Sequence, residues 1–463
     1  MKRREFLKTS ALIAAATSTS GVAQATTLLD PDRQALAGNS PESRPSEALL
    51  ASAPMLQNFA ETSVGVAFAV GDMANGYVIY GTKPDLSDGR KVMCGGYRTT
   101  DISDRVIQVR LTGLLPSTTY YYRIGADRIA YKGGYNMKIV GHEEDEHIYS
   151  FVTAGDNTRA HFCVINDTHV QWVPFGRAVE KIEELRPTCV VWNGDASNVE
   201  ETIEAQTRIF LTPDISRKDY AARIPYLFCP GNHDSRGMAN RHLERIWMYR
   251  QPEERLSRDW DLGRNFAVRM GDMAMIGLDT AEDKLDTNPI FAGLFNSAAY
   301  REAQVDWLRS ALSRPEIAKA PYLVAFCHIP LFDPDPKRNP GDVAPDDKDP
   351  QYDTDFAMWQ RTCARMWCPL LEKAGCQLII TAHQHHYRYD APTAERPWAQ
   401  IVGGGPEHAA DTSNNSPEQF PTVIEGLVEE GHLKVTIHNL RTGKIQAVHT
   451  FEPRKKKFLK AKI

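Results

Sequence analysis

Gly231-Asn232-His233-Asp234 is the stretch that decides the fold of this chain. It follows Tyr226-Leu227-Phe228-Cys229, a short apolar run typical of a buried strand. Pro230 and Gly231 end that strand and begin a tight loop. An amide, an imidazole and a carboxylate therefore stand together at a strand end, where open α/β sheets place their chemistry. Turns also favour Asn, Asp and Gly, so the tetrapeptide alone fits a plain turn equally well.

Four other predicted strands end in the same way. They are Phe162–Ile165 followed by Asp167 and His169, Cys189–Trp192 followed by Asp195, Tyr322–Phe326 followed by His328, and Leu378–Ile380 followed by His383 and His385. A capping Asp or a core His explains any one of them, but turn chemistry does not explain five at one position relative to a strand. Because such strand ends meet at one edge of a sheet, the sequence predicts a shared crevice.

Helical patterns alternate with these strands. Apolar residues recur at helical spacing over 177–185, 301–312 and 362–373, and Gly375 ends the last of these helices. A β-hairpin is expected over 433–451. Strands that alternate with helices indicate an α/β layer structure, predicted here as an αββα sandwich over 156–463.

The region 54–155 is predicted to be all β. Val64, Val66, Phe68 and Val70 alternate with small residues, and Asn75-Gly76 is a strong hairpin signal. The spacing of Leu114, Pro116, Thr118 and Tyr120 resembles the tyrosine corner of fibronectin type III domains. We therefore predict a fibronectin III-like β-sandwich whose aromatic residues form its core and which has no catalytic role.

The N-terminus carries an export pattern. Arg3-Arg4-Glu5-Phe6-Leu7-Lys8 is typical of a twin-arginine signal, and Ala23-Gln24-Ala25 of its cleavage site. We predict a twin-arginine signal peptide over 1–25 and a flexible leader over 26–53. The twin-arginine export machinery would then be a partner, and the mature protein would be periplasmic or secreted. The alternative is a disordered basic N-terminus with a chance Arg pair.

Composition excludes some function classes. The net charge is −5, and nucleic-acid binding needs a basic face, so no nucleic-acid partner is expected. The apolar run Ala11–Ala16 is too short to span a membrane in the mature protein. Most of the 8 cysteines lie in apolar strand-like or amphipathic runs and are expected to be free thiols.

The strand-end residues indicate a metal centre. Imidazole and carboxylate together suit first-row transition metals such as Zn, Fe and Mn. Seven candidates are more than one ion needs, and they can serve two ions if a carboxylate bridges them.

Five ordered blocks make the family resemblance specific. They are Asp167-x-His169, Gly194-Asp195, Gly231-Asn232-His233-Asp234, His328 and His383-x-His385, and over 161–386 they resemble the calcineurin-like metallophosphoesterases. The resemblance implies one metal held by Asp167, His169, Asp195 and His385, and another held by Asp195, Asn232, His328 and His383. His233 would be the catalytic imidazole.

The resemblance also implies a reaction. Two divalent or trivalent ions, Fe, Mn or Zn, would lower the pKa of a bridging water so that hydroxide attacks the phosphorus of a small phosphate ester. His233 would protonate the leaving group or steady the charged oxygens. We expect an exported phosphomonoesterase. The alternatives are a phosphodiesterase acting on cyclic nucleotides or phospholipid headgroups, and a non-catalytic surface-binding protein with a vestigial metal core.

Two positions depart from related patterns. The predicted domain order resembles purple acid phosphatases, but His169 and Asn198 replace the glycine and the metal-binding tyrosine of those enzymes. A coloured ferric-tyrosinate centre is therefore not expected. Related protein phosphatases have an Asp at the Asn198 position to orient the catalytic His, so either Asp234 or nothing is predicted to orient His233. Ala382 replaces a usual glycine, a small change that is expected to be tolerated.

Further residues are candidates near the crevice. Arg236, His386 and Trp172 are predicted substrate contacts, and a surface ion pair is the alternative for Arg236. The segment 333–353, rich in Pro and Asp, is expected to form a loop at the rim. Gly403-Gly404-Gly405-Pro406 fits a tight turn better than a phosphate cradle.

Overall fold

The computed structural model describes residues 48–94, 105–249, 262–334, 355–406 and 419–455. The predicted signal peptide, most of the predicted leader and most of the predicted 333–353 loop lie outside these ranges. Within them, no helix has both the length and the apolar character that a membrane span requires.

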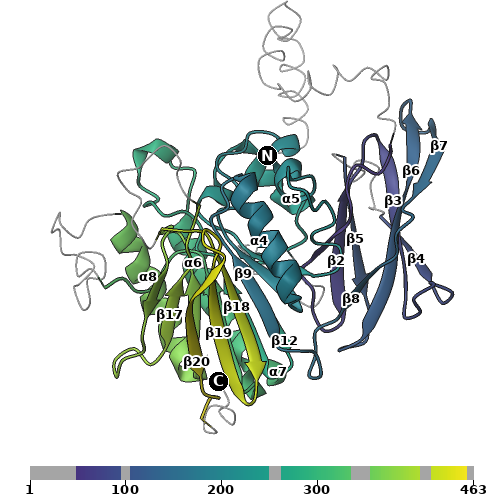
Figure 1. Cartoon of the computed structure of the whole chain (residues 1–463). Helices are drawn as coiled ribbons and strands as arrows, with labels where there is room; N and C mark the ends of the chain where they lie inside the picture. The colour runs from purple at the N-terminus through teal and green to yellow at the C-terminus, as the bar shows by residue number, and fades with distance from the viewer. Residues whose placement is uncertain (1–47, 95–104, 250–261, 335–354, 407–418, 456–463) are drawn as a thin grey trace, which may run out of the picture. The chain divides into compact units, whose positions relative to one another are not determined.

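The first sheet has nine strands in the order β20-β19-β18-β9-β10-β11-β1-β2-β5 (Figure 1). Their bounds are β1 Met55–Gln57, β2 Ser63–Ala69, β5 Val106–Thr112, β9 His161–Ile165, β10 Cys189–Asn193, β11 Tyr226–Cys229, β18 Thr422–Glu429, β19 His432–Asn439 and β20 Lys444–Phe451. Strands β9, β10 and β11 are parallel, with Ile165 beside Trp192 and Asn193 beside Cys229. Their carboxyl ends therefore lie at one edge of the sheet.

The second sheet has six strands in the order β12-β13-β14-β15-β17-β16. Their bounds are β12 Phe266–Met270, β13 Met273–Leu278, β14 Tyr322–Cys327, β15 Leu378–Thr381, β16 Arg388–Asp390 and β17 Ala399–Val402. Strands β13, β14, β15 and β17 are parallel. Every residue of β13, β14 and β15 is buried, which explains why these segments are continuously apolar in the sequence.

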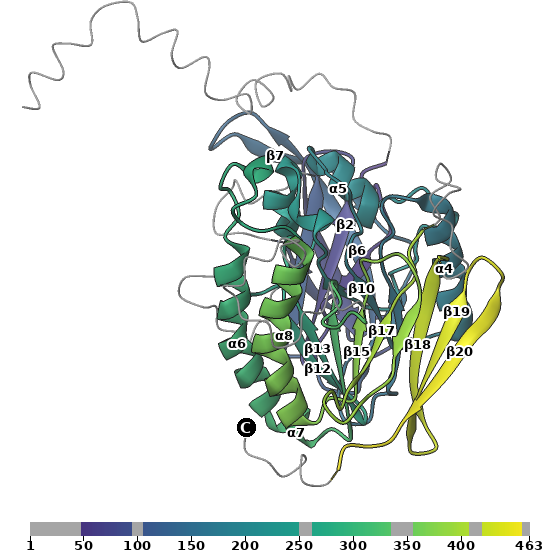
Figure 2. The same ribbon diagram turned by 90° about the vertical axis from the view of Figure 1, so that its left-hand side faces the viewer.

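Helices cover the outer faces of the two sheets. Helices α6 (Ser297–Ser313), α7 (Pro315–Lys319) and α8 (Asp355–Ala374) share a core with the second sheet, whereas α4 (Trp172–Leu185) and α5 (Ile203–Phe210) share one with the first. Figure 2 shows α6 and α8 on one side and α4 on the other. Short 3-10 turns are η2 (His233–Ser235), η3 (Met238–Arg245) and η4 (Pro289–Phe291). The predicted αββα sandwich is confirmed, although each predicted helix starts earlier than expected.

The N-terminal region is a β-sandwich, as predicted. Its outer sheet contains β3 (Ala74–Gly81), β4 (Arg90–Met93), β6 (Thr119–Tyr131), β7 (Met137–Glu144) and β8 (Tyr149–Val152). Residues of this sheet share a core with residues of β1, β2 and β5. The hydroxyl of Tyr120 accepts a hydrogen bond from the backbone N–H of Leu115 at 3.0 Å, the contact that defines a tyrosine corner.

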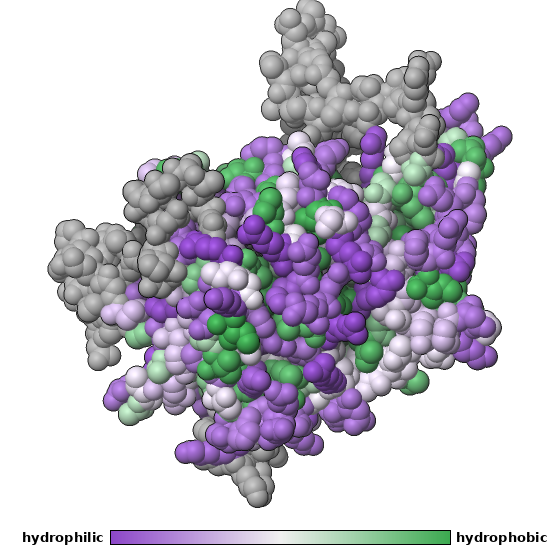
Figure 3. Space-filling model, viewed as in Figure 1, coloured by the Kyte–Doolittle hydropathy of each residue, from purple (hydrophilic) through white to green (hydrophobic). Residues whose placement is uncertain are grey.

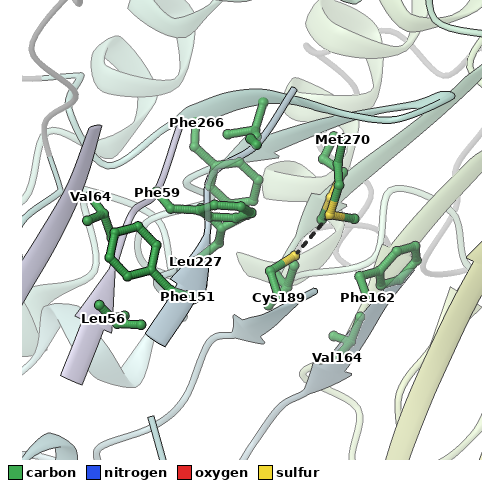
Figure 4. Close-up of a cluster of buried hydrophobic side chains, with 14 of the residues drawn as sticks. Leu56, Phe59, Val64, Phe151, Phe162, Val164, Cys189, Leu227, Phe266 and Met270 are labelled. Atoms are coloured by element: carbon green, nitrogen blue, oxygen red, sulfur yellow. Dashed lines mark hydrogen bonds between the residues drawn. The ribbon is translucent and has the colours of Figure 1, made fainter. Parts of the chain in front are cut away.

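One sheet runs through both predicted domains. Strand β1 pairs in parallel with β11, so Gln57 lies beside Tyr226. Figure 4 shows Leu56, Val64 and Phe151 in the same apolar cluster as Leu227 and the β9 residues Phe162 and Val164. The predicted border at 155/156 is therefore not a gap in the core. The sandwich is attached to the sheet that carries the strand-end residues.

The last residues of the predicted leader contact the sandwich. Leu49 is buried, and Leu50 forms a β-bridge with Val70. The flexibility of the leader stays a prediction.

Polar residues dominate the face of the molecule drawn in Figure 3, where apolar groups are scattered.

All eight cysteines are free thiols, and seven of them are buried. The expectation of free thiols agrees with this arrangement.

Candidate metal centre

The strand-end side chains converge between the carboxyl ends of the two sheets. Two groups of potential ligand atoms form there, each with all its atoms within 4.8 Å of one another. One group contains Asp167, His169, Asp195 and His385, and the other contains Asp195, His328 and His383. Asp195 belongs to both. The predicted convergence of the strand-end residues is therefore present, and Asp195 is the carboxylate shared by both groups.

In the first group, imidazole nitrogens and carboxylate oxygens face one point. The Nε2 atoms of His169 and His385 lie 3.1 Å apart. His169 Nε2 is 3.5 Å from Asp195 Oδ2, and His385 Nε2 is 3.4 Å from Asp167 Oδ1. Two nitrogens and two oxygens at such separations are suited to surrounding one cation.

In the second group, His328 Nε2 lies 3.2 Å from Asp195 Oδ2. Asn232 joins this group through its side chain, because its Oδ1 is 3.0 Å from His383 Nδ1. The structure thus brings all seven predicted ligands together. Their role as ligands stays a prediction.

Two buried atoms in the cluster lack hydrogen bonds. Asp167 Oδ2 accepts from Asn166 Nδ2 at 2.7 Å and from the backbone N–H of His383 at 3.0 Å. Asp167 Oδ1 and His328 Nε2, both within the described residues, have no hydrogen-bond partner. A buried carboxylate oxygen without a partner is costly, and a cation between these atoms would satisfy both. The residues present therefore fit transition-metal ions.

Backbone strain marks the same positions. Asp167, His169, Asp195, His383 and His385 all have positive φ, between 44° and 69°. Non-glycine residues in this region cost on the order of 1 kcal/mol each and cluster at functional sites. Gly194 adjoins them at φ +82°, and a Cβ there would come within 2.3 Å of His328 Nδ1. Packing of both sheets holds these turns in shape.

Neutral oxygens orient two of the imidazoles. His169 Nδ1 lies 2.9 Å from Asn198 Oδ1, and His328 Nδ1 lies 2.8 Å from the carbonyl oxygen of Asn193. A carbonyl oxygen only accepts, so each Nδ1 carries the hydrogen and each Nε2 is left to face the cluster. This is the usual support of a metal-binding histidine.

The charges of the cluster suit metal binding. Burial opposes the ionisation of Asp195, but the imidazoles of His328 and His169 outweigh it and hold the pKa of that carboxyl well below its usual range. Burial together with the neighbouring His328 lowers the pKa of His383 to about 4. At neutral pH, Asp195 is ionised and His383 is neutral, the forms that bind metals. Burial opposes the protonation of His328, but Asp195 and Asp167 outweigh it and raise its pKa to about 10, so His328 would release a proton when a metal binds.

His233 lies beside the cluster and faces it with its ring. Its backbone N–H donates to Asp195 Oδ1 at 2.9 Å, and its ring centroid is 4.9 Å from that of His169. His233 Nδ1 lies 3.3 Å from the carbonyl oxygen of Asn198, and Arg236 Nη1 donates to His233 Nε2 at 3.1 Å. Asn198 thus supports His169 through its side chain and His233 through its main chain.

The hypothesis that Asp234 orients His233 is wrong. Asp234 Oδ1 accepts from the N–H and the hydroxyl of Ser197 at 3.0 and 2.8 Å, and its Oδ2 accepts from the N–H of Gly231 at 2.8 Å. Every hydrogen bond of this carboxylate is spent on joining the second and third sequence blocks. The orientation of His233 comes from Asn198 and Arg236 instead.

We predict that Asp234→Asn lowers the free energy of unfolding by about 3 kcal/mol, because a single amide oxygen replaces a carboxylate that serves three buried donors. Urea denaturation of both proteins would measure this. The exposed Asp156→Asn variant is the control and should be neutral. Equal stability of Asp234→Asn and the parent would contradict the assigned role.

The structure places the three predicted substrate contacts as follows. Arg236 lies beside His233 and is partly buried: its side chain is 17% exposed and forms ion pairs with Glu282 and Asp283. His386 Nδ1 donates to the carbonyl oxygen of Gln384 at 2.7 Å. Trp172, the first residue of α4, is partly buried against the core of the first sheet, with the Arg208 guanidinium 5.6 Å from its ring centroid.

The glycine run after β17 supports the cluster from behind. The N–H groups of Gly403 and Gly404 donate to Thr381 and Thr422, so they do not form a phosphate cradle. A Cβ on Gly403 would come within 2.1 Å of Asn166 Oδ1, and a Cβ on Gly405 within 2.9 Å of His385. The glycines let the backbone approach these side chains closely.

Sequence reasoning missed Glu282 and Asp283. They follow β13, whose carboxyl end lies beside that of β14, with Leu278 next to Cys327. The strand-end rule that identified the other residues also applies to this strand and was the available signal.

The calcineurin-like phosphoesterase family model matches residues 160–387. The solved structure of PhoD is similar at 12% identity, with 89% of this chain and 92% of that chain covered and a TM-score of 0.57. A second similar structure is GAP50, described as the anchor in the inner membrane complex of Plasmodium, at 16% identity, 65% and 91% coverage and a TM-score of 0.43. No curated protein matches the sequence. At 12% identity the likeness to PhoD shows the fold alone.

Proposed function

We propose that this chain uses two metal ions to hydrolyse phosphomonoesters after export. The premise is that residues 160–387 are a calcineurin-like phosphoesterase domain and that the chain is a hydrolase of phosphoric esters. The observation that carries the two-ion proposal is Asp195, which belongs to both groups of potential ligands. A carboxylate between two groups can bridge two ions.

We assign one ion to Asp167, His169, Asp195 and His385, and the other to Asp195, Asn232, His328 and His383. Divalent ions bound there would polarise the phosphoryl group and lower the pKa of water toward neutrality. Fe, Mn and Zn all suit this set of nitrogen and oxygen donors. Asn232 contributes a neutral oxygen, so only two carboxylates offset the charge of the ions. The remaining positive charge would attract a phosphate ester.

His233 and Arg236 act next to the ions in this proposal. Arg236 Nη1 and His233 Nε2 lie 3.1 Å apart, so both reach the same small region beside Asp195. Arg236 would bind a phosphoryl oxygen through that nitrogen. Because His233 Nε2 accepts from Arg236 in the structure, it would take up a proton from solvent before it could stabilise or protonate the leaving oxygen. His386 remains a proposed substrate contact from the sequence.

Export rests on the sequence alone, because Arg3 and Arg4 lie outside the described residues. We propose a periplasmic or secreted location reached by the twin-arginine route. Fractionation of cells that express the chain with and without the Arg3→Lys and Arg4→Lys changes would test it. The changed protein should be found in the cytoplasmic fraction, whereas the unchanged protein should be found in the periplasmic or secreted fraction.

Metal removal tests the catalytic proposal. We expect the protein to bind two ions per chain, to lose phosphoesterase activity on chelation, and to regain it with Mn, Zn or Fe. The measurement is elemental analysis together with rates on an aryl phosphate monoester and the matching diester. Faster monoester hydrolysis supports the proposal, and faster diester hydrolysis favours the phosphodiesterase alternative. A purified protein without metal or activity would indicate a vestigial core instead.

A further inference from the structure

A pair of acidic residues lies against the proposed site without belonging to either ligand group. Glu282 and Asp283 follow the carboxyl end of β13 in the second sheet. The side chain of Glu282 is fully buried. Neither residue belongs to the sequence blocks described above. Their contacts reach both the metal cluster and the residues beside it.

Glu282 grips Arg236 with both of its oxygens. Arg236 Nε donates to Oε2 at 2.9 Å, and Nη2 donates to Oε1 at 2.6 Å. A bidentate pair of this kind fixes the plane of a guanidinium. The plane it fixes points Nη1 toward His233 Nε2. After these bonds, one N–H of Nη1 remains for another acceptor.

Asp283 lies between two cationic side chains and His383. Its Oδ1 accepts from Arg236 Nη2 at 2.7 Å and from Lys284 Nζ at 2.9 Å. Its Oδ2 lies 3.9 Å from His383 Nε2. The other ring nitrogen of His383, Nδ1, faces Asn232 Oδ1 at 3.0 Å. Asp283 therefore faces the nitrogen that points away from the Asn232 side of the cluster. The separation of 3.9 Å exceeds a hydrogen bond, so Asp283 acts on the His383 ring through its negative charge.

A buried arginine of helix α6 holds the loop that carries Glu282 and Asp283. Arg301 of α6 is 4% exposed, and its guanidinium donates to the carbonyl oxygens of Thr280 at 3.1 Å and of Glu282. Ala281 between them has φ +54°. These bonds turn the two carboxylates toward Arg236 and His383.

We infer that Glu282 and Asp283 are positioning residues: Asp283 orients His383 for its metal ion, and Glu282 holds Arg236 beside His233. The inference rests on the proposed function. A purely structural ion pair would stabilise the fold to a similar degree with or without metal. A positioning pair has a different signature, because each residue affects a different step.

Two substitutions separate the steps. Asp283→Asn should lower the affinity for one of the two metal ions about 10- to 100-fold and leave the affinity for the other unchanged. Metal titration of the metal-free protein would measure both affinities. Glu282→Gln should leave both metal affinities unchanged and lower kcat/KM for an aryl phosphate about 10-fold, since a loosened Arg236 binds the phosphoryl group poorly. Both substitutions break an ion pair with Arg236 and should lower the thermal stability of the metal-free protein, so affinities and rates are measured at a temperature where every variant is folded.

Asp272→Asn is the matched control, because Asp272 is exposed at the other end of β13. It should change neither metal affinity nor rate. If Asp283→Asn does not fold, Asp283→Glu keeps the charge but displaces it, and should show the same selective loss of one ion. Unchanged affinities and rates in the variants of a parent that binds two ions would overturn the inference alone. A parent that binds no metal would overturn the proposed function itself.

Discussion

Asp195→Asn is expected to lose bound metal and about 1,000-fold or more in kcat. One oxygen of Asp195 lies 3.5 Å from His169 Nε2 and 3.2 Å from His328 Nε2, so it faces both ligand groups. The other oxygen accepts the N–H of His233 at 2.9 Å. The amide keeps the shape of the side chain but removes the negative charge. It also presents an NH₂ group to one side, where an acceptor is needed.

Elemental analysis of the purified variant, together with rates measured at saturating metal, would check this prediction. Asp156→Asn serves again as the control, since Asp156 is exposed and precedes β9 in the sequence. Loss of both ions, or of one ion with severe loss of rate, agrees with a bridging role. If Asp195→Asn kept both ions at the affinity of the parent, Asp195 would not be the bridge.

Much of the centre was predictable because its signal is local. Asp167, Asp195 and Asn232 each stand within three residues of the end of a short apolar strand, and parallel pairing of β9, β10 and β11 brings those ends together. The α/β layers followed from the same alternation of patterns. Strand length, apolar character and the following polar residue predicted that these residues converge, whereas the family resemblance supplied the assignment of ligands to each metal and the role of His233.

The supporting contacts were not predictable in the same way. Asn198 reaches His233 through its main-chain carbonyl, which any residue type possesses. Asp234 has the right chemistry to orient an imidazole but is spent on Ser197 and Gly231. Which acceptor a buried donor uses depends on the path of the folded loops. Residue type and spacing do not predict that path.

The joining of the sandwich to the central sheet was hidden for a related reason. Strand β1 has three residues, Met55–Gln57, too few to show a period. Its partner β11 lies far along the chain, and tertiary packing selects it. The sequence therefore indicated two β-containing regions correctly and missed that they share one sheet.

His233→Ala should lower kcat about 100- to 10,000-fold while leaving metal content unchanged. The imidazole lies beside the cluster, but the bond to Asp195 comes from the backbone N–H, which alanine retains. The substitution therefore removes the group proposed to act on the leaving oxygen without disturbing the proposed bridge. KM should change much less than kcat. Arg236 remains held by Glu282 and can still bind the phosphoryl group.

The choice of substrate makes this test specific. If His233 protonates the leaving oxygen, the loss should be largest for an alkyl phosphate, whose leaving group is poor, and small for an aryl phosphate with an acidic leaving group. If His233 instead steadies the phosphoryl oxygens, both esters should lose rate equally. His142→Ala, an exposed histidine of the sandwich, is the control and should leave both rates unchanged. Unchanged rates of His233→Ala on both esters would remove the assignment and leave Arg236 as the group beside the metals that acts on the substrate.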